Sequence, residues 1–485
     1  MWFKNVIAEG NKFGYIVNEE KSWIILKDPK KLDEAKSLFS STNIKLTIEG
    51  KRHLGAALGT FDFRSQYAAE KVEVWCNELR CLADFAKTQP QAAYSAFTHG
   101  TLNKYTYFMR TIPDMNEFIK PVDDVIRSEL LPSLLNAIVT DADRDLYSLP
   151  IRHGGLGIPV LSEIAQSQYE SSKRITLPLV TIMITQGNEL PNKNEVLEIK
   201  QRIRKENDTK ITERTLKVEQ NQTPHTLKAL HDAKMPGASS WLSVLPLEEF
   251  GFTLNKGEFR DALNLRYGRS LKGLPQTCPC GQPFNVTHAL NCKRGGFVTM
   301  RHNNIRDFEA DILSKIVNDV ELEPELQPVS GEIFNGLSGD SARPDIRARG
   351  VWRAGQNAFF DVRVTNTQSA SQVNQTTESV LRKHEQEKKR CYNKRIMNIE
   401  HGTFTPLVFA VSGGMGKECS MFHKHVAERI AVKSGERYER ILSTIRCKLS
   451  FLILKSALMC VRGSRNFKLK NFEEFELVST MAKIE

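Results

Sequence analysis

The sequence predicts a multidomain chain: an α-helical N-terminal part with a few strands, then a small zinc module, then an α/β domain. Three observations lead to this fold class. A chain of 485 residues is too long for one ordinary core. Apolar residues recur at helical spacing early in the chain, as in Val72, Trp75 and Leu79. Cysteines and a histidine cluster between positions 278 and 292, ahead of alternating strand-like and helical segments.

The charge and the cysteine content limit the class of protein. Lys and Arg number 68 against 57 Asp and Glu, and the net charge of +11 suits a polyanionic partner. Nine scattered cysteines indicate a reducing compartment and not a disulfide scaffold. The N-terminus has no secretory signal, and the apolar run 449–461 is interrupted by Lys455, which predicts a buried helix. We therefore expect no membrane partner and an intracellular, nuclear location.

Changes in composition divide the chain into six segments. Residues 1–60 hold short β-rich runs, and a proline-punctuated helical module follows. The next segment is highly charged and lacks aromatic residues, which indicates either an exposed helix or a partly disordered linker. The expected segments are a strand-containing piece (1–60), a helical domain (61–190), a charged linker (191–239), a helical lead-in with the zinc module (240–296), an α/β domain (297–415) and a C-terminal helical extension (416–485).

The cysteine and histidine cluster predicts a metal site. Cys278 and Cys280 are followed by His288 and Cys292, and Gly281 allows a sharp turn after the first pair. Three thiolates and one imidazole can complete a tetrahedral shell, and zinc is the metal that such a shell favours. With all four positions occupied by protein ligands, this zinc would be structural and not catalytic.

Two aspartates in strand-like runs predict a second metal site. A helix over residues 298–320 and a strand over 327–334 are expected to precede them. RPDIRAR, with Asp345, and AFFDVRV, with Asp361, look like the two strands of a hairpin, so the carboxylates would approach each other. Two such carboxylates repel each other, and a bound Mg²⁺ or Mn²⁺ would offset this repulsion. The cation could also activate a water molecule to attack a phosphodiester. A third ligand is expected from Glu309 or Asp311. The pattern does not distinguish between these two acids, and we take Glu309 as the candidate.

A basic helix expected over residues 378–399 completes the pattern. His384, Lys388, Tyr392 and Arg395 share one face at helical spacing. A lysine there could orient the attacking water or stabilise the phosphate. The catalytic candidates on this helix are Lys388, Lys389 and Tyr392, and the candidates for contact with a phosphate backbone are Arg382, Lys383, Arg390, Lys394 and Arg395.

These motifs carry a resemblance. CPCGQPFNVTHALNC, RHNNIRD, RPDI, FFDVRV and EQEKKRCYNK, together with FGYIVNEEKSW and LPIRHGGLGI nearer the N-terminus, resemble the C-terminal part of non-LTR retrotransposon polyproteins. Those proteins carry a reverse transcriptase, a CCHC zinc motif and a PD-(D/E)XK restriction-like endonuclease, in that order. The resemblance implies that residues 1–60 are a remnant of the end of the palm. It further implies that 61–190 are thumb-like and that 297–415 are the nuclease.

The chain departs from that family's pattern in two places. Arg363 stands two positions after the second acid, where such nucleases usually place lysine, so Lys388 or Lys389 is expected to replace it. No Asp-Asp pair lies in a strand within residues 1–60, and Asp123-Asp124 has a helical context. We therefore expect no polymerase activity.

Three readings of function follow. The first is a metal-dependent, DNA-nicking endonuclease, a phosphodiesterase whose partners are DNA and an RNA template. The alternative is a zinc-containing nucleic-acid-binding protein with a decayed, non-cleaving nuclease fold, which Arg363 favours. The third is a protein without either activity, which serves only in interactions.

Overall fold

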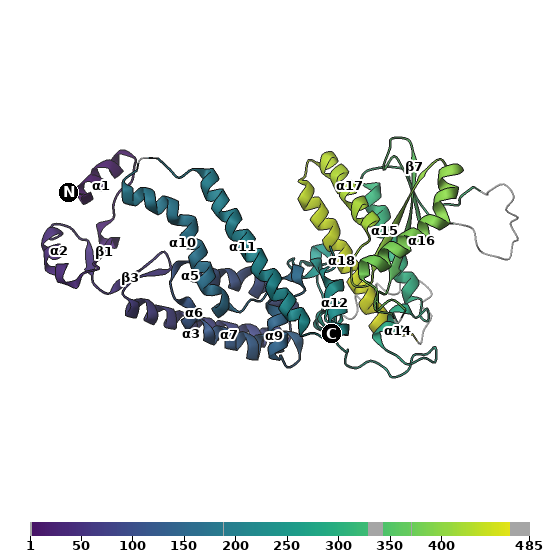
Figure 1. Cartoon of the computed structure of the whole chain (residues 1–485), viewed down its shortest axis with the longest axis horizontal. Coiled ribbons are helices and arrows are strands. Elements are labelled where there is room, and N and C mark those ends of the chain that lie inside the picture. The colour runs from purple at the N-terminus through teal and green to yellow at the C-terminus, as the bar shows by residue number, and fades with distance from the viewer. Residues whose placement is uncertain (1, 188, 328–342, 370, 466–485) are drawn as a thin grey trace. The chain divides into compact units, whose positions relative to one another are not determined.

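The computed structural model of the chain describes residues 2–187, 189–327, 343–369 and 371–465 (Figure 1). Helices make up about 61% of the chain and strands form only small sheets, so the expected helical character is confirmed. The chain divides into two compact units with interleaved sequences. The N-terminal unit comprises Met1–Lys87, Ala96–Val139 and Pro159–Glu213, and the C-terminal unit comprises Thr88–Ser95, Thr140–Ile158 and Arg214–Glu485. Across the described residues, every helix falls short of the length or the apolar character that a membrane span needs.

The N-terminal unit begins with short strands and continues as helices. β1 and β2 pair in parallel, and β3 and β4 form an antiparallel hairpin whose turn holds Leu54 and Gly55 at positive φ. The elements of this unit are α1 (Trp2–Lys12), β1 (Trp23–Ile25), α2 (Leu32–Leu38), β2 (Lys45–Thr47), β3 (Gly50–His53), β4 (Ala56–Gly59), α3 (Phe61–Ala86), α5 (Leu102–Thr111), α6 (Met115–Phe118), α7 (Lys120–Val125), α8 (Leu131–Leu135), α10 (Leu161–Thr185) and most of α11 (Lys193–Gln220).

Helix α3 organises the core of this unit. The hydroxyl of Thr60 caps its first turn by accepting the N–H of Phe63 at 3.3 Å. The predicted apolar stripe is buried at Val72, Trp75 and Leu79. The Trp75 ring packs against two aromatic rings of α5, at centroid distances of 4.9 and 4.8 Å.

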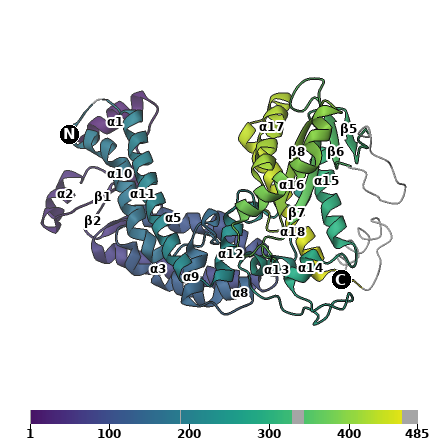
Figure 2. The same ribbon diagram turned by 45° about the vertical axis from the view of Figure 1, so that its right-hand side comes forward.

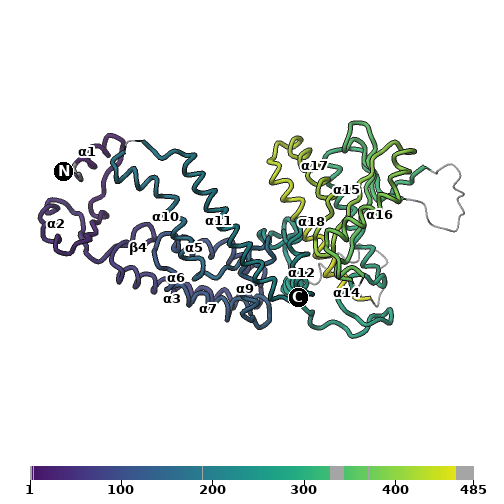
Figure 3. Tube along the Cα trace, in the orientation of Figure 1, coloured from purple at the N-terminus to yellow at the C-terminus, as the bar shows by residue number. Residues whose placement is uncertain are grey.

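Two long helices continue the N-terminal unit, as the trace in Figure 3 shows for α10 and α11. Asp123 accepts the backbone N–H groups of Leu161 and Ser162, each at 2.8 Å, so its carboxylate caps the start of α10. Arg174 of α10 forms an ion pair with Glu206 of α11 at 2.6 Å. Of the two alternatives for the charged segment, an exposed helix or a disordered linker, the helix is observed over α11.

The C-terminal unit is built on one four-stranded sheet in the order β5-β6-β7-β8 (Figure 2). β6 pairs antiparallel with both β5 and β7, whereas β7 and β8 pair in parallel and are joined by α16. The elements of this unit are α4 (Pro90–Ser95), α9 (Asp141–Ser148), α12 (Pro224–Lys234), α13 (Lys256–Arg266), α14 (Val286–Asn291), α15 (Phe297–Ser314), β5 (Val320–Leu322), β6 (Ile346–Arg349), β7 (Asn357–Thr365), α16 (Thr377–Asn398), β8 (Thr403–Ala410), α17 (Lys417–Ser434) and α18 (Tyr438–Arg462).

The two faces of the sheet are covered differently. Phe360 and Val362 of β7 point into a core formed with α15, α17 and α18, whereas Phe359 packs with Ile396 of α16 on the other face. Side chains alternate between faces along a strand, so Asp361 shares the α16 face with Phe359. The sheet therefore presents this aspartate to the basic helix.

The expected order of helix, three strands and helix is observed from α15 to α16, with β8 following, but two boundaries differ from the prediction. The first strand is β5, upstream of the expected segment 327–334, of which residues 328–334 lie outside the described residues. The expected C-terminal extension is not separate, because Phe422 of α17 and Leu449 of α18 are buried in the same core as the sheet. An apolar face on a helix predicts that the helix packs against another element, but it does not identify that element.

The expected helical domain 61–190 is also not contiguous, since α4 and α9 belong to the C-terminal unit. The buried carboxamide of Gln91 donates to the carbonyl of Phe252 at 2.9 Å and accepts the N–H of Leu254 at 2.7 Å. Arg266 donates to the carbonyls of Ile151 and Gly155 at 3.1 Å. These buried polar contacts join segments far apart in sequence, which local periodicity cannot reveal.

Helix α12 lies in the segment expected as a linker and is instead a packed part of the C-terminal unit. Its Asp232 is 1% exposed and accepts the hydroxyl of Thr367 at 2.8 Å. Lys228, one turn earlier, lies 3.4 Å from Asp232 and donates to the hydroxyl of Thr377 at 2.6 Å. A fully satisfied buried network of this kind fixes the connection between β7 and α16.

Candidate active site and metal centre

Asp345 directly precedes β6, and Asp361 lies in the middle of β7. Ile346 pairs with Phe360, so the antiparallel register continues one step further to place Asp345 opposite Asp361. The Oδ2 atom of Asp345 accepts the backbone N–H of Val362 at 2.6 Å, which ends the ladder between the strands. The two predicted carboxylates are therefore brought together.

Asp361 is a buried acid that is paired with a lysine. Its residue is 3% exposed, and its Oδ2 atom lies 2.6 Å from the Nζ atom of Lys388. Burial raises the pKa of the Asp361 carboxyl, the charge of Asp345 raises it further, and the Lys388 ammonium acts in the opposite direction. When both carboxylates are ionised, two negative charges share one ammonium here.

Lys388 lies on the face of helix α16 that packs against the sheet. The hydroxyl of Thr376 caps its N-terminus by accepting the N–H of Ser379 at 3.3 Å, and Leu381 and Ile396 are buried on its inner face. Of the two candidate lysines, only Lys388 contacts Asp361 among the ion pairs of the described residues. Lys389, one residue on, points away and pairs with Glu418 of α17 at 2.7 Å.

Tyr392 lies one turn beyond Lys388. Its hydroxyl donates to the carbonyl of Arg343 at 3.4 Å, and its ring centroid is 5.7 Å from Nζ of Lys388. Burial, followed by the nearby charge of Asp361, raises the pKa of the Tyr392 hydroxyl. This group therefore stays protonated near neutral pH and can act as a hydrogen-bond donor but not as a base.

The predicted ligand Glu309 contacts a histidine of α17 in this structure. Glu309 is completely buried, and both its carboxylate oxygens lie 3.0 Å from Nε2 of His423 on α17. The alternative, Asp311, is solvent-exposed and pairs with Lys315 at 3.5 Å. Sequence spacing placed both acids on the correct helix but could not show which side of it faces the hairpin.

Sequence reasoning missed His302 of α15. Its Nε2 atom lies 3.0 Å from Oδ1 of Asp345. The available signal was helical phase, because His302 lies three residues before the buried Ile305 and so continues the inward-facing stripe. The motif RHNNIRD contains this histidine.

The predicted nucleic-acid contacts fall into three groups. Helical phase places Lys383, Arg390 and Lys394 on the outer, solvent-exposed face of α16, opposite the sheet, and Arg382 is also exposed. Arg395 instead donates to the carbonyls of Leu326 and Gln327 at 3.0 Å, so its role here is structural. In the described part of the chain, none of these five residues forms an ion pair or a hydrogen bond with either aspartate.

Arg363 forms an ion pair with a neighbouring acid. Its guanidinium lies 3.1 Å from Glu387 of α16, which also contacts Nδ1 of His384 at 3.1 Å. The Nε2 atom of His384 lies 3.3 Å from the Thr365 hydroxyl. Arg363 therefore belongs to a polar network with Glu387 and His384.

The predicted Cys and His residues form a cluster that can hold one structural zinc ion. The ligand atoms of Cys278, Cys280, His288 and Cys292 all lie within 4.8 Å of one another. This is the one group of three or more such ligands found among the described residues. Burial raises the pKa of the Cys278 thiol, whereas a backbone N–H from Gln282 lowers that of Cys280.

Local backbone structure builds this cluster. Cys278 donates its N–H to the carbonyl of Gln282 at 2.9 Å, and Gly281 closes the turn with φ +88°. Asn285 caps α14 by accepting the N–H of His288 at 2.8 Å, which fixes the imidazole on the first turn. Leu290 of α14 packs against the end of α18, so the cluster is attached to the rest of the unit.

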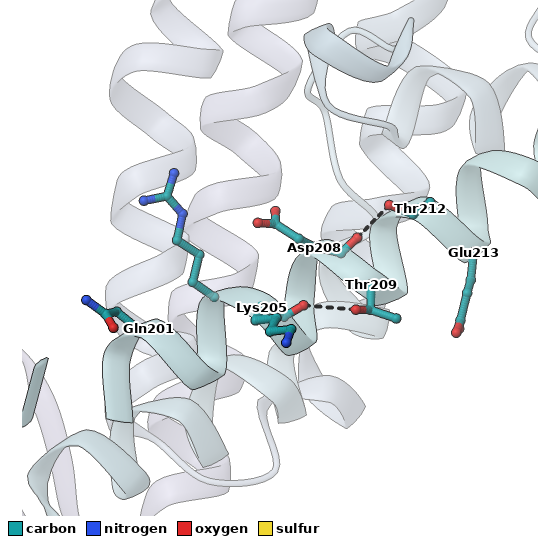
Figure 4. Close-up of a pocket in the computed structure, with 7 residues that line it drawn as sticks. Gln201, Lys205, Asp208, Thr209, Thr212 and Glu213 are labelled. Carbon is teal, nitrogen blue, oxygen red and sulfur yellow. Dashed lines mark hydrogen bonds between the residues drawn. The ribbon is translucent and has the colours of Figure 1, made fainter. Parts of the chain in front are cut away.

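The pocket in Figure 4 offers no competing site. Its walls come from α11 alone, and two of its threonine hydroxyls bond to backbone carbonyls of the same helix. Its lining residues are Gln201, Arg204, Lys205, Asp208, Thr209, Thr212 and Glu213. A single exposed helix face without converging groups lacks the enclosure of a ligand site.

Among known proteins, no family model and no curated protein matches the chain.

Proposed function

We propose that the chain is a metal-dependent endonuclease that nicks duplex DNA. We further propose that it corresponds to the nuclease portion of a non-LTR retrotransposon polyprotein and lacks a polymerase site. The observation that carries the proposal is the convergence of Asp345, Asp361 and Lys388 from two strands and a helix. Under this proposal the protein acts in the nucleus and also contacts an RNA template.

The topology around this site supports assignment to the PD-(D/E)XK class. That class is built on a helix, three antiparallel strands, a crossover helix and a parallel strand, which is the order α15, β5, β6, β7, α16, β8. The second acid of the class lies on the third strand, as Asp361 lies on β7. The lysine comes from the crossover helix, as the resemblance implied.

The aspartates suit a hard divalent cation. Asp345 and Asp361 would hold Mg²⁺ or Mn²⁺ through carboxylate oxygens, the ligand type that both ions prefer. Burial, followed by the charge of Asp345, raises the pKa of the Asp361 carboxyl, and a bound dication would favour its ionised form. When bound, the cation supplies charge stabilisation for a phosphodiester and a water of lowered pKa.

The remaining residues of the site have defined tasks under this proposal. Lys388 would place its ammonium beside the reacting phosphate, where it offsets the growing negative charge. Tyr392 would donate a hydrogen bond from its protonated hydroxyl. Arg363 cannot act as a base, because a guanidinium does not readily lose its proton and this one is paired with Glu387.

Plasmid nicking tests the proposal. The zinc-loaded full chain is incubated with supercoiled plasmid and Mg²⁺ or Mn²⁺, and the conversion to open circles is followed. The variants Asp345→Asn and Asp361→Asn should lose more than the about 10–100-fold that removal of an outer-shell partner costs. Asp311→Asn is the matched control on α15, because its carboxylate is exposed and pairs with Lys315.

Binding without cleavage is the second candidate function, and Arg363 in the lysine position favours it. In that case the protein would retain plasmid at low salt, lose it steeply as salt rises and never yield open circles. Equal nicking by wild type and by both aspartate variants would instead reject the proposed site.

A further inference from the structure

The carboxylate of Asp345 is held at both oxygens. Oδ2 accepts the backbone N–H of Val362 from β7 at 2.6 Å, and Oδ1 lies 3.0 Å from Nε2 of His302 on α15. A carboxylate has about four acceptor positions, so two donors still leave each oxygen able to accept a further partner. Asp345 is therefore oriented by two separate elements without being saturated.

His302 is suited to orientation and not to ligation. No set of three metal-ligand atoms at the hairpin lies within 4.8 Å of one another among the described residues, so the imidazole does not join both aspartates around one point. A neutral imidazole that donates from Nε2 fixes a carboxylate without cancelling its charge. The side chain of His302 is 33% exposed and that of Asp345 is 14% exposed, so the pair lies at the mouth of the site.

We propose that His302 is a positioning residue of the proposed nuclease centre: it donates a hydrogen bond from Nε2 to Oδ1 of Asp345 and so fixes the carboxylate that receives the cation. This inference rests on the proposed function for its consequence in cleavage. Its immediate effect is on cation affinity, because outer-shell partners commonly set that affinity by about 10–100-fold.

The test compares two replacements of the same histidine. His302→Gln keeps an amide N–H that can reach Oδ1, whereas His302→Leu keeps volume and loses the donor. Mn²⁺ affinity is measured by calorimetric titration of the zinc-loaded full chain, and circular dichroism melting confirms that each variant is folded. Asn303→Leu is the matched control, since this neighbour on α15 is partly exposed and, among the described residues, it is His302 that bonds to Asp345 from this helix.

We expect His302→Leu to weaken Mn²⁺ binding by about 10-fold or more and His302→Gln to recover most of that loss. The Mn²⁺ concentration for half-maximal nicking should shift by the same factor, with a much smaller change in the rate at saturating Mn²⁺. Unchanged Mn²⁺ affinity in folded His302→Leu, or equal losses in the Leu and Gln variants, would overturn the inference, as would absence of Mn²⁺ binding in the wild type.

The two proposals fail in different ways. Wild-type protein that binds Mn²⁺ in an Asp345-dependent and His302-dependent manner but never nicks plasmid supports the positioning role and rejects the nuclease function. Protein that nicks normally with His302→Leu at every Mn²⁺ concentration supports the nuclease and rejects the positioning role.

Discussion

The ammonium of Lys388 lies 2.6 Å from the buried carboxylate of Asp361, although the lysine is on a helix and the aspartate on a central strand. The contact has a stability consequence as well as a proposed catalytic one. A carboxylate that is 3% exposed loses its hydration, and the lysine replaces part of it. The same two groups can therefore be tested for both effects.

Replacement of Lys388 should separate these effects. Lys388→Met leaves Asp361 buried without its cation and should lower the free energy of unfolding by about 1–3 kcal/mol, measured by urea denaturation. The double variant Lys388→Met/Asp361→Asn should recover much of that stability while remaining unable to nick plasmid. Lys389→Met, which removes the ion pair to Glu418, is the matched control and should keep nicking. Full nicking by Lys388→Met would contradict the assignment.

The Cys3His cluster predicts one zinc ion per chain. Cys280→Ser should lose this zinc in elemental analysis and lower the melting midpoint by about 5 °C or more, because the cluster joins α14 to the core around α18. Cys81→Ser changes an exposed cysteine of the N-terminal unit and should keep the metal. Freshly purified wild-type protein without zinc would contradict the prediction.

Glu309 should contribute to stability and not to the metal site. Glu309→Leu leaves Nε2 of His423 buried without its two carboxylate contacts and should cost about 1–3 kcal/mol of unfolding free energy. Its Mn²⁺ affinity should match that of the wild type as long as the variant is folded. A selective loss of Mn²⁺ binding without loss of stability would restore Glu309 as a ligand.

Helix α12 should behave as a part of the C-terminal unit. Asp232→Ala leaves Lys228 buried without its carboxylate and should destabilise the protein by about 3–5 kcal/mol in urea denaturation. Asp311→Ala, at an exposed acid, should leave the denaturation midpoint within error. Equal midpoints for the two variants would show that the network around Asp232 adds no stability.

Much of the C-terminal unit was predictable from local patterns. Alternating runs separated by a glycine-containing turn predicted the pairing of β6 and β7, and the pairing places Asp345 opposite Asp361. Helical phase put Lys388 and Tyr392 on one face, and the structure turns that face towards the sheet. These features depend on residues that are close together in the sequence, so local patterns could predict them.

The features that sequence missed depend on contacts between distant segments. The buried partner of Glu309 is His423 on α17, and the partner of His302 on α15 is Asp345, which directly precedes β6. The residues next to Glu309 in the sequence do not show whether it is a buried structural acid or a metal ligand, because either kind of acid would face inwards from this helix. The burial of α4 through Gln91 likewise depends on backbone groups of residues 252 and 254.

The most direct test of the central claim is calorimetric Mn²⁺ titration of the zinc-loaded chain, comparing Asp345→Asn, Asp361→Asn and the double variant. If both carboxylates hold one cation, the wild type binds one Mn²⁺ at this site, each single variant loses most of the affinity, and the double variant loses little more. Independent, additive losses, or single variants that bind as tightly as the wild type, would contradict a shared cation.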